Sequence, residues 1–392
     1  MSPEAIRLAF VAACEAELAA LKPGNVHVHA EGHGMTVAEF RTSAAVASGP
    51  LCAAGSGLGA RILDAVEATR AAVGQNTNLG IVLLCAPLAM AAERAGEERS
   101  DQGLHASICQ EARLGSPSAG HSNGLSGPLE PLASSAQTRQ GRAAPGAALL
   151  KQVDSKGEPL AEFEAEPQPC LTSRSEGLPA SLCRVLDGAG PEDAAAVFRA
   201  IALAAPGGLG EVAEHDVRAP PAVSLDVAMG AAAHRDSIAR QWSGRFADIL
   251  GAEDDADPGA EARPWTTGLG LAAHTEAVAR GLGEAAATQL VFLRFLAAWP
   301  DSHVARCHGV AVAEAVREEA RAWLRRFEAD SAAVQAGLLA WDAALKRRGI
   351  NPGTTADLTV AVLFALRIER GLQAAGDAGC VRRVPGPAGR AQ

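Results

Sequence analysis

The sequence contains no tyrosine, and aromatic residues make up only 4% of its 392 residues. Lysine is also scarce, because arginine carries almost all of the positive charge; the lysines are Lys22, Lys151, Lys156 and Lys346. A core with few aromatics must be built from Ala, Leu and Val. Such a core suits closely packed helices better than a sheet rich in aromatic and β-branched residues. The composition therefore favours a helical protein.

Features that would place the chain in other classes are also missing. The N-terminal residues lack the basic start and apolar run of a signal peptide, and the eight cysteines form no C-x-x-C pair. The longest apolar run, Leu79–Ala92, contains Pro87 and is shorter than the roughly 20 residues of a membrane span, so we expect a buried core helix there. A net charge of −10 argues against a nucleic-acid surface. We therefore expect a cytoplasmic protein that binds neither membranes nor nucleic acid; its oligomeric state stays open.

Helical periodicity covers most of the chain, and no segment alternates like a strand. From about 95 to 182 the chain is instead rich in Ser, Gly, Pro, Gln and Glu without a sustained period. A structureless loop of this length is uncommon inside a compact domain. We therefore predict an all-α fold, a multi-helix bundle with a long disordered insertion. Its helical catalytic domain comprises 1–94 and 183–375, the low-complexity insertion 95–182, and a flexible tail 376–392.

Within the bundle, apolar periodicity and stop signals predict the individual helices. Thr36 and Glu39 have the spacing of a capping box at the start of the second helix. The predicted helices cover 3–21, 36–48, 61–73, a segment from 79, 191–205, 223–250, 271–298, 303–328, 332–348 and 355–374.

The polar residues that could perform chemistry gather at the breaks between these helices. Five breaks combine Pro or Gly with Asn, Asp or His, at 22–33, 74–80, 206–216, 300–306 and 351–357. Helix N-termini offer free backbone N–H groups and a dipole that favours anions. Each break alone can be explained by N-capping, which prefers Asn, Asp, Ser and Thr. Five similar breaks favour a common site over five unrelated caps.

Residues at these breaks resemble the signature blocks of a known family, in the same order along the chain. The blocks are Lys22–Val26, Gly32–Met35, Gly74–Gly80, Pro206–Gly208, Asp301–Arg306 and Asn351–Asp357. They resemble the triphosphoribosyl-dephospho-CoA synthases that serve citrate lyase and malonate decarboxylase, over roughly 1–94 and 183–375. The resemblance implies an enzyme whose substrates are ATP, accompanied by Mg²⁺, and dephospho-CoA. The 2′-hydroxyl of dephospho-CoA would displace adenine from ATP and take the triphosphoribosyl group.

That reaction breaks an N-glycosidic bond through an oxocarbenium-like ribose. It needs a carboxylate near the developing cation, an acid and a base, and cations around the triphosphate. Asp301 and Asp226 are the candidate carboxylates and Mg²⁺ ligands, and His303 the acid–base candidate; His215-Asp216 is a further acid–base pair. Asp301 would equally serve as an N-cap. The candidate substrate-binding residues are Lys22, Asn25, His33, Glu67, Asn76, Thr77, Arg235, Arg240, Arg306, Asn351 and Asp357.

The chain departs from the synthase blocks at several of these positions. Leu79 follows Asn78 where the synthases usually have His-Lys, His27 begins the pair that is usually Asp-Arg, and Thr354 replaces a Gly. The departures are similar to a variant found in organisms that carry C1 units on tetrahydromethanopterin and methylofuran. One alternative is therefore a paralogous enzyme of tetrahydromethanopterin or methylofuran coenzyme biosynthesis. The other is a non-enzymatic helical scaffold that binds a nucleotide.

Overall fold

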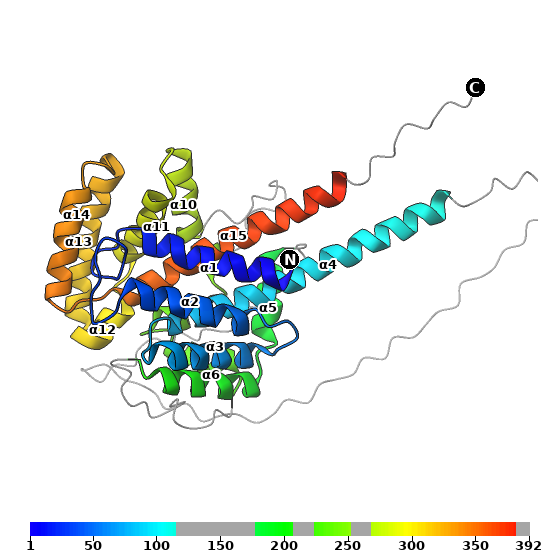
Figure 1. Ribbon diagram of the computed structural model, residues 1–392, viewed down its shortest axis with the longest axis horizontal. Coiled ribbons are helices and arrows are strands. Elements are labelled where there is room, and N and C mark those ends of the chain that lie inside the picture. The colour runs from blue at the N-terminus through cyan, green and yellow to red at the C-terminus, as the bar shows by residue number, and fades with distance from the viewer. Residues whose placement is uncertain (115–176, 207–222, 252–267, 382–392) are drawn as a thin grey trace, which may run out of the picture. The chain divides into compact units, whose positions relative to one another are not determined.

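The structure is a computed structural model (Figure 1), and it describes most but not all of the chain. Contacts divide the chain into two units, residues 1–104 with 171–392, and residues 105–170. The described backbone covers residues 1–114, 177–206, 223–251 and 268–381. Within these ranges the side chains are described as well, except in 99–114 and 375–381.

These residues form fifteen helices and no β-strand, which confirms the predicted all-α class. The only extended pairings among them are two isolated bridges, His27 with Ala30 and Gly32 with Met35. The helices are α1 Pro3–Ala19, α2 Val37–Leu51, α3 Leu58–Val73, α4 Leu79–Leu114, α5 Leu178–Asp187, α6 Pro191–Ala204, α7 Leu225–Ala232, α8 Ser237–Ser243, α9 Ala247–Leu250, α10 Leu269–Ala279, α11 Glu284–Ala298, α12 Ser302–His308, α13 Val310–Ala329, α14 Gln335–Arg347 and α15 Gly353–Val381.

Local signals explain where several helices begin. The Ser2 hydroxyl caps α1 by accepting from Ala5 N at 3.2 Å. Thr36 and Glu39 form the predicted capping box at α2. The Asp236 carboxylate caps α8 by accepting from two backbone N–H groups. A side-chain oxygen at the N-cap satisfies backbone donors that would otherwise lack a partner.

The first part of α4 is the central core helix of the larger unit. Its segment Leu79–Glu98 is the one described stretch long and apolar enough to cross a membrane, with a mean hydropathy of 1.5, yet 78% of that window is buried. A helix that is apolar all round and covered on all sides belongs to the core of a large domain. The predicted core helix is confirmed.

The other helices of this unit pack around that core. Helix α3 packs between α2 and α6, α1 contacts α2 and α15, and α11 contacts α10 and α13 (Figure 1). The core consists mainly of Ala, Leu and Val, with Phe10 and Phe364 meeting edge to face where α1 crosses α15. Ends of helices distant in sequence are thereby brought close together.

Three of the predicted long helices are divided. The 223–250 segment forms α7, α8 and α9, and the backbone has positive φ at Arg245 and Phe246 between the last two. Gly281, with φ of 71°, separates α10 from α11, and Gly309, with φ of 88°, separates α12 from α13. Glycine adopts this left-handed region without steric cost, so a helix ends there although the apolar pattern continues.

The helical body also reaches further into the predicted insertion than residues 95 and 182. Helix α4 continues through the buried Ala95 to Leu114, and α5 begins at Leu178, which is buried together with Leu182. At Ala95, Leu178 and Leu182, apolar side chains packed on the core stabilise the helix despite polar neighbours in the sequence. Helix α15 likewise extends to Val381. The rest of the insertion and of the tail, 115–176 and 382–392, lies outside the described residues.

Candidate active site

The first and last of the signature blocks lie in direct contact. Asn25 Nδ2 donates to Asn351 Oδ1 at 2.8 Å. Gly24 has a φ of 85°, and a Cβ on it would lie 2.8 Å from Pro352 Cδ. The block that follows α1 therefore packs tightly on the block that contains the start of α15. Only glycine fits this combination of left-handed backbone and close approach.

The third block reaches the same place from the start of α4. Asn76 Oδ1 accepts from Leu79 N at 3.1 Å, which caps the helix. A Cβ on Gly80 would lie 2.0 Å from Asp357 Oδ2, so the carboxyl group of Asp357 rests against the first turn of α4. Because Gly80 has no side chain, the last block's acidic residue can sit at this helix N-terminus.

The fifth block joins them through Asp301, which is 3% exposed. One of its oxygens accepts from Val304 N at 3.0 Å and thereby caps α12. The other accepts from Thr355 N at 2.8 Å and from Thr355 Oγ1 at 2.7 Å. Both oxygens of this carboxylate are therefore used to fix α12 to α15.

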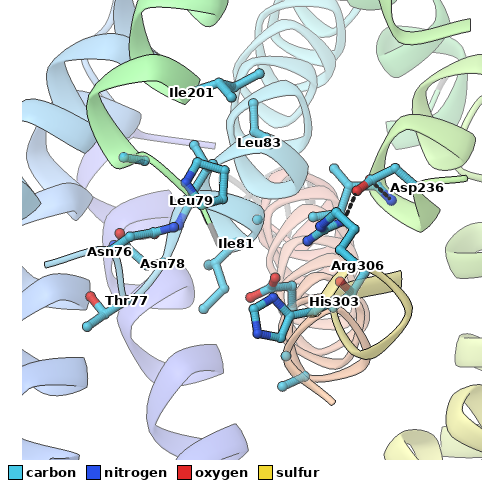
Figure 2. A pocket seen from close by; sticks show the side chains of 18 of the residues that line it. Asn76, Thr77, Asn78, Leu79, Ile81, Leu83, Ile201, Asp236, His303 and Arg306 are labelled. Atoms are coloured by element: carbon cyan, nitrogen blue, oxygen red, sulfur yellow. Dashed lines mark hydrogen bonds and ion pairs between the residues drawn. The ribbon is translucent and has the colours of Figure 1, made fainter. Parts of the chain in front are cut away.

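The blocks surround one cavity of about 710 Å³. In Figure 2, Asn76, Thr77 and Asn78 lie on one side of it, and His303 and the ion pair of Arg306 with Asp236 lie on the other. Leu79, Ile81, Leu83 and Ile201 line the space between and above them (Figure 2). The cavity thus combines a polar floor of amide, imidazole and guanidinium groups with an apolar wall from α4 and α6.

Two acidic side chains in this cavity are strongly affected by burial. Burial raises the pKa of the Asp357 carboxyl well above its ordinary value, and the nearby charge of Glu17 raises it further. Burial also raises the pKa of Glu17, but the ammonium of Lys22, 2.5 Å from Glu17 Oε1, opposes this. The pKa of His303 is lowered, first by burial, so its imidazole is neutral near pH 7.

Nine of the predicted site residues line this cavity, and they come from six elements or loops. Two of them, Asn25 and Asn351, contact each other, and His33 Nε2 donates to Gly24 O at 2.7 Å. The nine are Asn25, His33, Asn76, Thr77, Arg235, His303, Arg306, Asn351 and Asp357.

The structure places the two predicted carboxylates differently from our expectation. Asp301 does not line the cavity, because both of its oxygens are bound within the α12–α15 junction. Asp226 lies on α7 outside the cavity lining. Neither carboxylate therefore borders this cavity, and the roles expected of them at the ribosyl cation and Mg²⁺ stay predictions. In the described part of the chain, no cluster of three or more His, Cys, Asp and Glu could bind a metal ion.

Three further predicted ligands also lie outside the cavity lining. Lys22 is fully buried, and its ammonium is already bound to Glu17, Asn25 and Val26. Arg240 pairs with Asp248 at 2.9 Å and stacks over Trp299. Glu67 is exposed on α3. The charge of these side chains is suited to binding a substrate. Their position, however, depends on the residues that surround them in the fold, which the sequence does not reveal.

Several functional candidates were missed by sequence reasoning. Asp236, which the sequence analysis did not single out, binds Arg306 at the cavity. Glu17 carried a usable signal, because it occupies the otherwise apolar face of α1 that includes Phe10 and Cys14. The missed lining residues with polar side chains include Glu17, Arg70, Gln75, Asn78, Asp236 and His308.

Only the first residue of the fourth block, Pro206, belongs to the described part of the chain. Pro206 lines the cavity, but 207–222, which include the proposed acid–base pair His215-Asp216, lie outside the described residues.

A comparison of the chain with models of known protein families identifies its family. The chain matches the family model CitG, described as ATP:dephospho-CoA triphosphoribosyl transferase, over residues 3–141, 165–254 and 263–375. These segments include all six blocks and also extend into the predicted insertion. Neither the curated proteins nor the solved structures gave a match. The chain therefore belongs to the ATP:dephospho-CoA triphosphoribosyl transferase family.

Proposed function

We propose that this protein transfers the triphosphoribosyl group of ATP to the 2′-hydroxyl of dephospho-CoA and releases adenine. One observation carries the proposal: motif blocks far apart in sequence meet at one cavity, where Asn25 and Asn351, 326 residues apart, contact each other. This cavity contains a buried carboxyl, a neutral imidazole and several guanidinium groups. Breaking an N-glycosidic bond next to a triphosphate requires the same set of groups.

The cations of the cavity support binding of a triphosphate. Arg70 and Arg235 line it, and in the described residues neither guanidinium has an ion pair or side-chain hydrogen bond. Arg306 lines it as well, held by Asp236. The first turn of α4 adds backbone N–H groups and a dipole that favours anions. Planar guanidinium groups bind phosphate oxygens with two parallel hydrogen bonds.

Mg²⁺ is best assigned to the nucleotide and not to a protein cage. Magnesium keeps several waters and is usually held by substrate phosphates with one or two carboxylates. Glu17, Asp236 and Asp357 are acidic residues of the cavity lining, and Lys22 and Arg306 already bind the first two. We therefore propose that the ion enters as the companion of ATP.

Two groups have protonation states suited to moving the reaction's proton. Asp357, whose pKa is raised, can donate a proton to the departing adenine. His303, whose pKa is lowered, can accept the proton of the attacking hydroxyl. The bond between C1′ and N9 breaks with its electron pair on adenine, and the acceptor oxygen bonds to C1′. The proton lost by the hydroxyl balances the proton gained by adenine, so the reaction releases none.

The apolar wall is consistent with dephospho-CoA as acceptor. Leu83, Phe198, Ile201 and Met229 line the cavity beside its charged floor. The long, weakly polar pantetheine arm of dephospho-CoA can bury apolar surface there, while its diphosphate stays near the arginines. An acceptor that consists only of a nucleotide has no such arm and would bury less apolar surface against this wall.

A second candidate is an enzyme of tetrahydromethanopterin or methylofuran coenzyme biosynthesis. Asn78 and Leu79 occupy the positions where the synthases usually carry His-Lys, and both line the cavity. A cation is therefore replaced by an amide and an apolar side chain within the site itself. This change would alter which acceptor or which phosphate is bound, without affecting the fold.

Adenine release separates the candidates. The purified protein is incubated with ATP and Mg²⁺, alone and with dephospho-CoA, ADP, or pterin and furan precursors of the two coenzymes. We expect adenine only with dephospho-CoA, in amounts equal to the acceptor consumed. Turnover with a pterin or furan precursor instead would establish the second candidate, and intact ATP in every mixture would exclude both transfer reactions.

A further inference from the structure

Asp301 and Asp226, the carboxylates predicted to stabilise the ribosyl cation, do not line the cavity, but Glu17 does. It belongs to the buried face of α1, and its side chain is 5% exposed. Its neighbour Lys22 follows the end of the same helix and is fully buried. Burying two charges costs desolvation free energy, which their mutual attraction offsets only when the geometry is good.

The surroundings of Lys22 determine its charge. Its Nζ lies 2.5 Å from Glu17 Oε1, 2.7 Å from Val26 O and 3.2 Å from Asn25 Oδ1. All three atoms are acceptors when Glu17 is ionised. An ammonium has three N–H donors, one for each acceptor, whereas a neutral amine has two. These contacts fit a protonated Lys22 and a Glu17 that carries the compensating negative charge, whereas burial alone favours the neutral forms.

Asp357 has the opposite environment in the same cavity. Within the described residues its carboxyl group has no ion pair and lies against Gly80. Glu17 and Asp357 thus line the same cavity, and of these two only Glu17 has a cation bound to it. Environments that separate the protonation states of two carboxyl groups are how one site provides both an acid and an anion.

We propose that Glu17 is the carboxylate that stabilises the positive charge developing on the ribose of ATP, and that Lys22 is the positioning residue that keeps Glu17 ionised and fixed. This inference rests on the proposed function. As the bond from C1′ to N9 breaks and its electron pair leaves with adenine, positive charge spreads over C1′ and the ring oxygen. The Glu17 carboxylate offers that charge a preorganised partner and forms no covalent bond with it.

The Glu17→Gln variant tests this role, because glutamine keeps the length of the side chain and an oxygen that accepts from Lys22. We expect kcat to fall by about 10²- to 10³-fold, as when one preorganised electrostatic partner is removed, with the Kd of ATP unchanged. The matched control is Glu15→Gln on the same helix. Glu15 is half-exposed, pairs with Arg41 on the surface and should tolerate the change.

A second measurement distinguishes catalysis from a merely structural ion pair. The probe is an ATP analogue whose ribose ring oxygen is replaced by a protonated nitrogen, so that it carries the charge of the transition state. Wild type should bind this cation more tightly than ATP, and Glu17→Gln should lose that preference. An unchanged preference, or an unchanged kcat, would overturn the proposal.

If Glu17→Gln does not fold, as thermal unfolding would reveal, the double variant Glu17→Gln/Lys22→Met replaces the pair by neutral groups. Such replacements of buried pairs are often tolerated. The double variant should fold and remain inactive, and an active double variant would contradict the role of Glu17. Failure of the proposed function would look different, because wild type itself would then release no adenine.

Discussion

At the scale of single residues, the cavity assigns different tasks to chemically similar side chains. Asp301, Asp357 and Glu17 are acids within the same group of helix ends; Asp301 and Glu17 are buried and Asp357 is partly buried. Asp301 uses both oxygens to join α12 to α15, Glu17 binds Lys22, and Asp357 has no cation partner among the described residues. The neighbours of each carboxyl group, and not its position in the sequence, thus decide whether it is structural, anionic or acidic.

Replacing Asp357 by Asn should remove the proton donor for adenine. Loss of a general acid lowers rates by about 10²- to 10⁴-fold. In wild type, kcat should fall as pH rises through the raised pKa of Asp357, because the acid form is lost. Asp357→Asn should lack this decrease at alkaline pH. The decrease at acidic pH, where His303 becomes protonated, should remain. The pH dependence of adenine release checks both.

The same substitution should change stability in the opposite direction from activity. A carboxyl whose folded pKa is raised contributes stability that is present below its unfolded pKa and lost as pH rises through the folded pKa. Asparagine cannot ionise, so Asp357→Asn should melt at a higher temperature than wild type at alkaline pH. Near pH 3.8, the ordinary pKa of this carboxyl, the two should differ less. A variant that is less stable at all pH values would contradict burial as the cause of the shift.

At the scale of helices and loops, the site depends on helix starts that meet. The sequence predicted the starts of α2 and α12 because Thr36 with Glu39 and Asp301 are local caps. It did not predict the divisions at Gly281 and Gly309, because these glycines stand within an uninterrupted apolar pattern. Local chemistry is readable along the chain, whereas a backbone turn that only tertiary packing demands is not.

Gly80→Ala should damage the site while preserving the overall fold. The new Cβ would lie 2.0 Å from Asp357 Oδ2 and 2.6 Å from Ile238 Cδ1, so the carboxyl group must move. We expect kcat to fall at least tenfold, because displacing a catalytic group by about 1 Å can cost 10²-fold. The matched control is Gly49→Ala on α2, where a Cβ would meet nothing within 4 Å. Equal adenine release by both variants would contradict the placement of Asp357.

At the scale of the whole molecule, the order of six short blocks was sufficient to predict a common site. Nine of the predicted residues do line one cavity. Lys22, Arg240 and Glu67 do not, because Lys22 binds Glu17, Arg240 binds Asp248 and Glu67 is exposed on α3. Spacing along the chain shows which residues belong together, but not which of them are bound to one another and which face the open space.

The insertion provides a test of where the catalytic unit ends. We predict that replacing 115–176 by a flexible Gly/Ser linker of about 20 residues leaves adenine release intact, because all six signature blocks lie outside this segment. Removing 95–182 instead should prevent folding, since it deletes the buried Leu178 and Leu182. Truncating one buried leucine to alanine lowers the free energy of unfolding by about 2–5 kcal/mol. Circular dichroism and adenine release check both variants. Loss of activity in a folded 115–176 replacement would show that this segment contributes to the reaction.

The transfer itself can be followed most directly with ATP labelled with ¹³C in its ribose, in a single turnover with dephospho-CoA. Mass spectrometry of the products would show where the labelled sugar goes. We predict that the label moves to dephospho-CoA together with all three phosphates, while unlabelled adenine is released in equal amount. A label that stays in an intact adenine nucleotide, or that is released as free ribose triphosphate, would contradict the assignment of this cavity to triphosphoribosyl transfer.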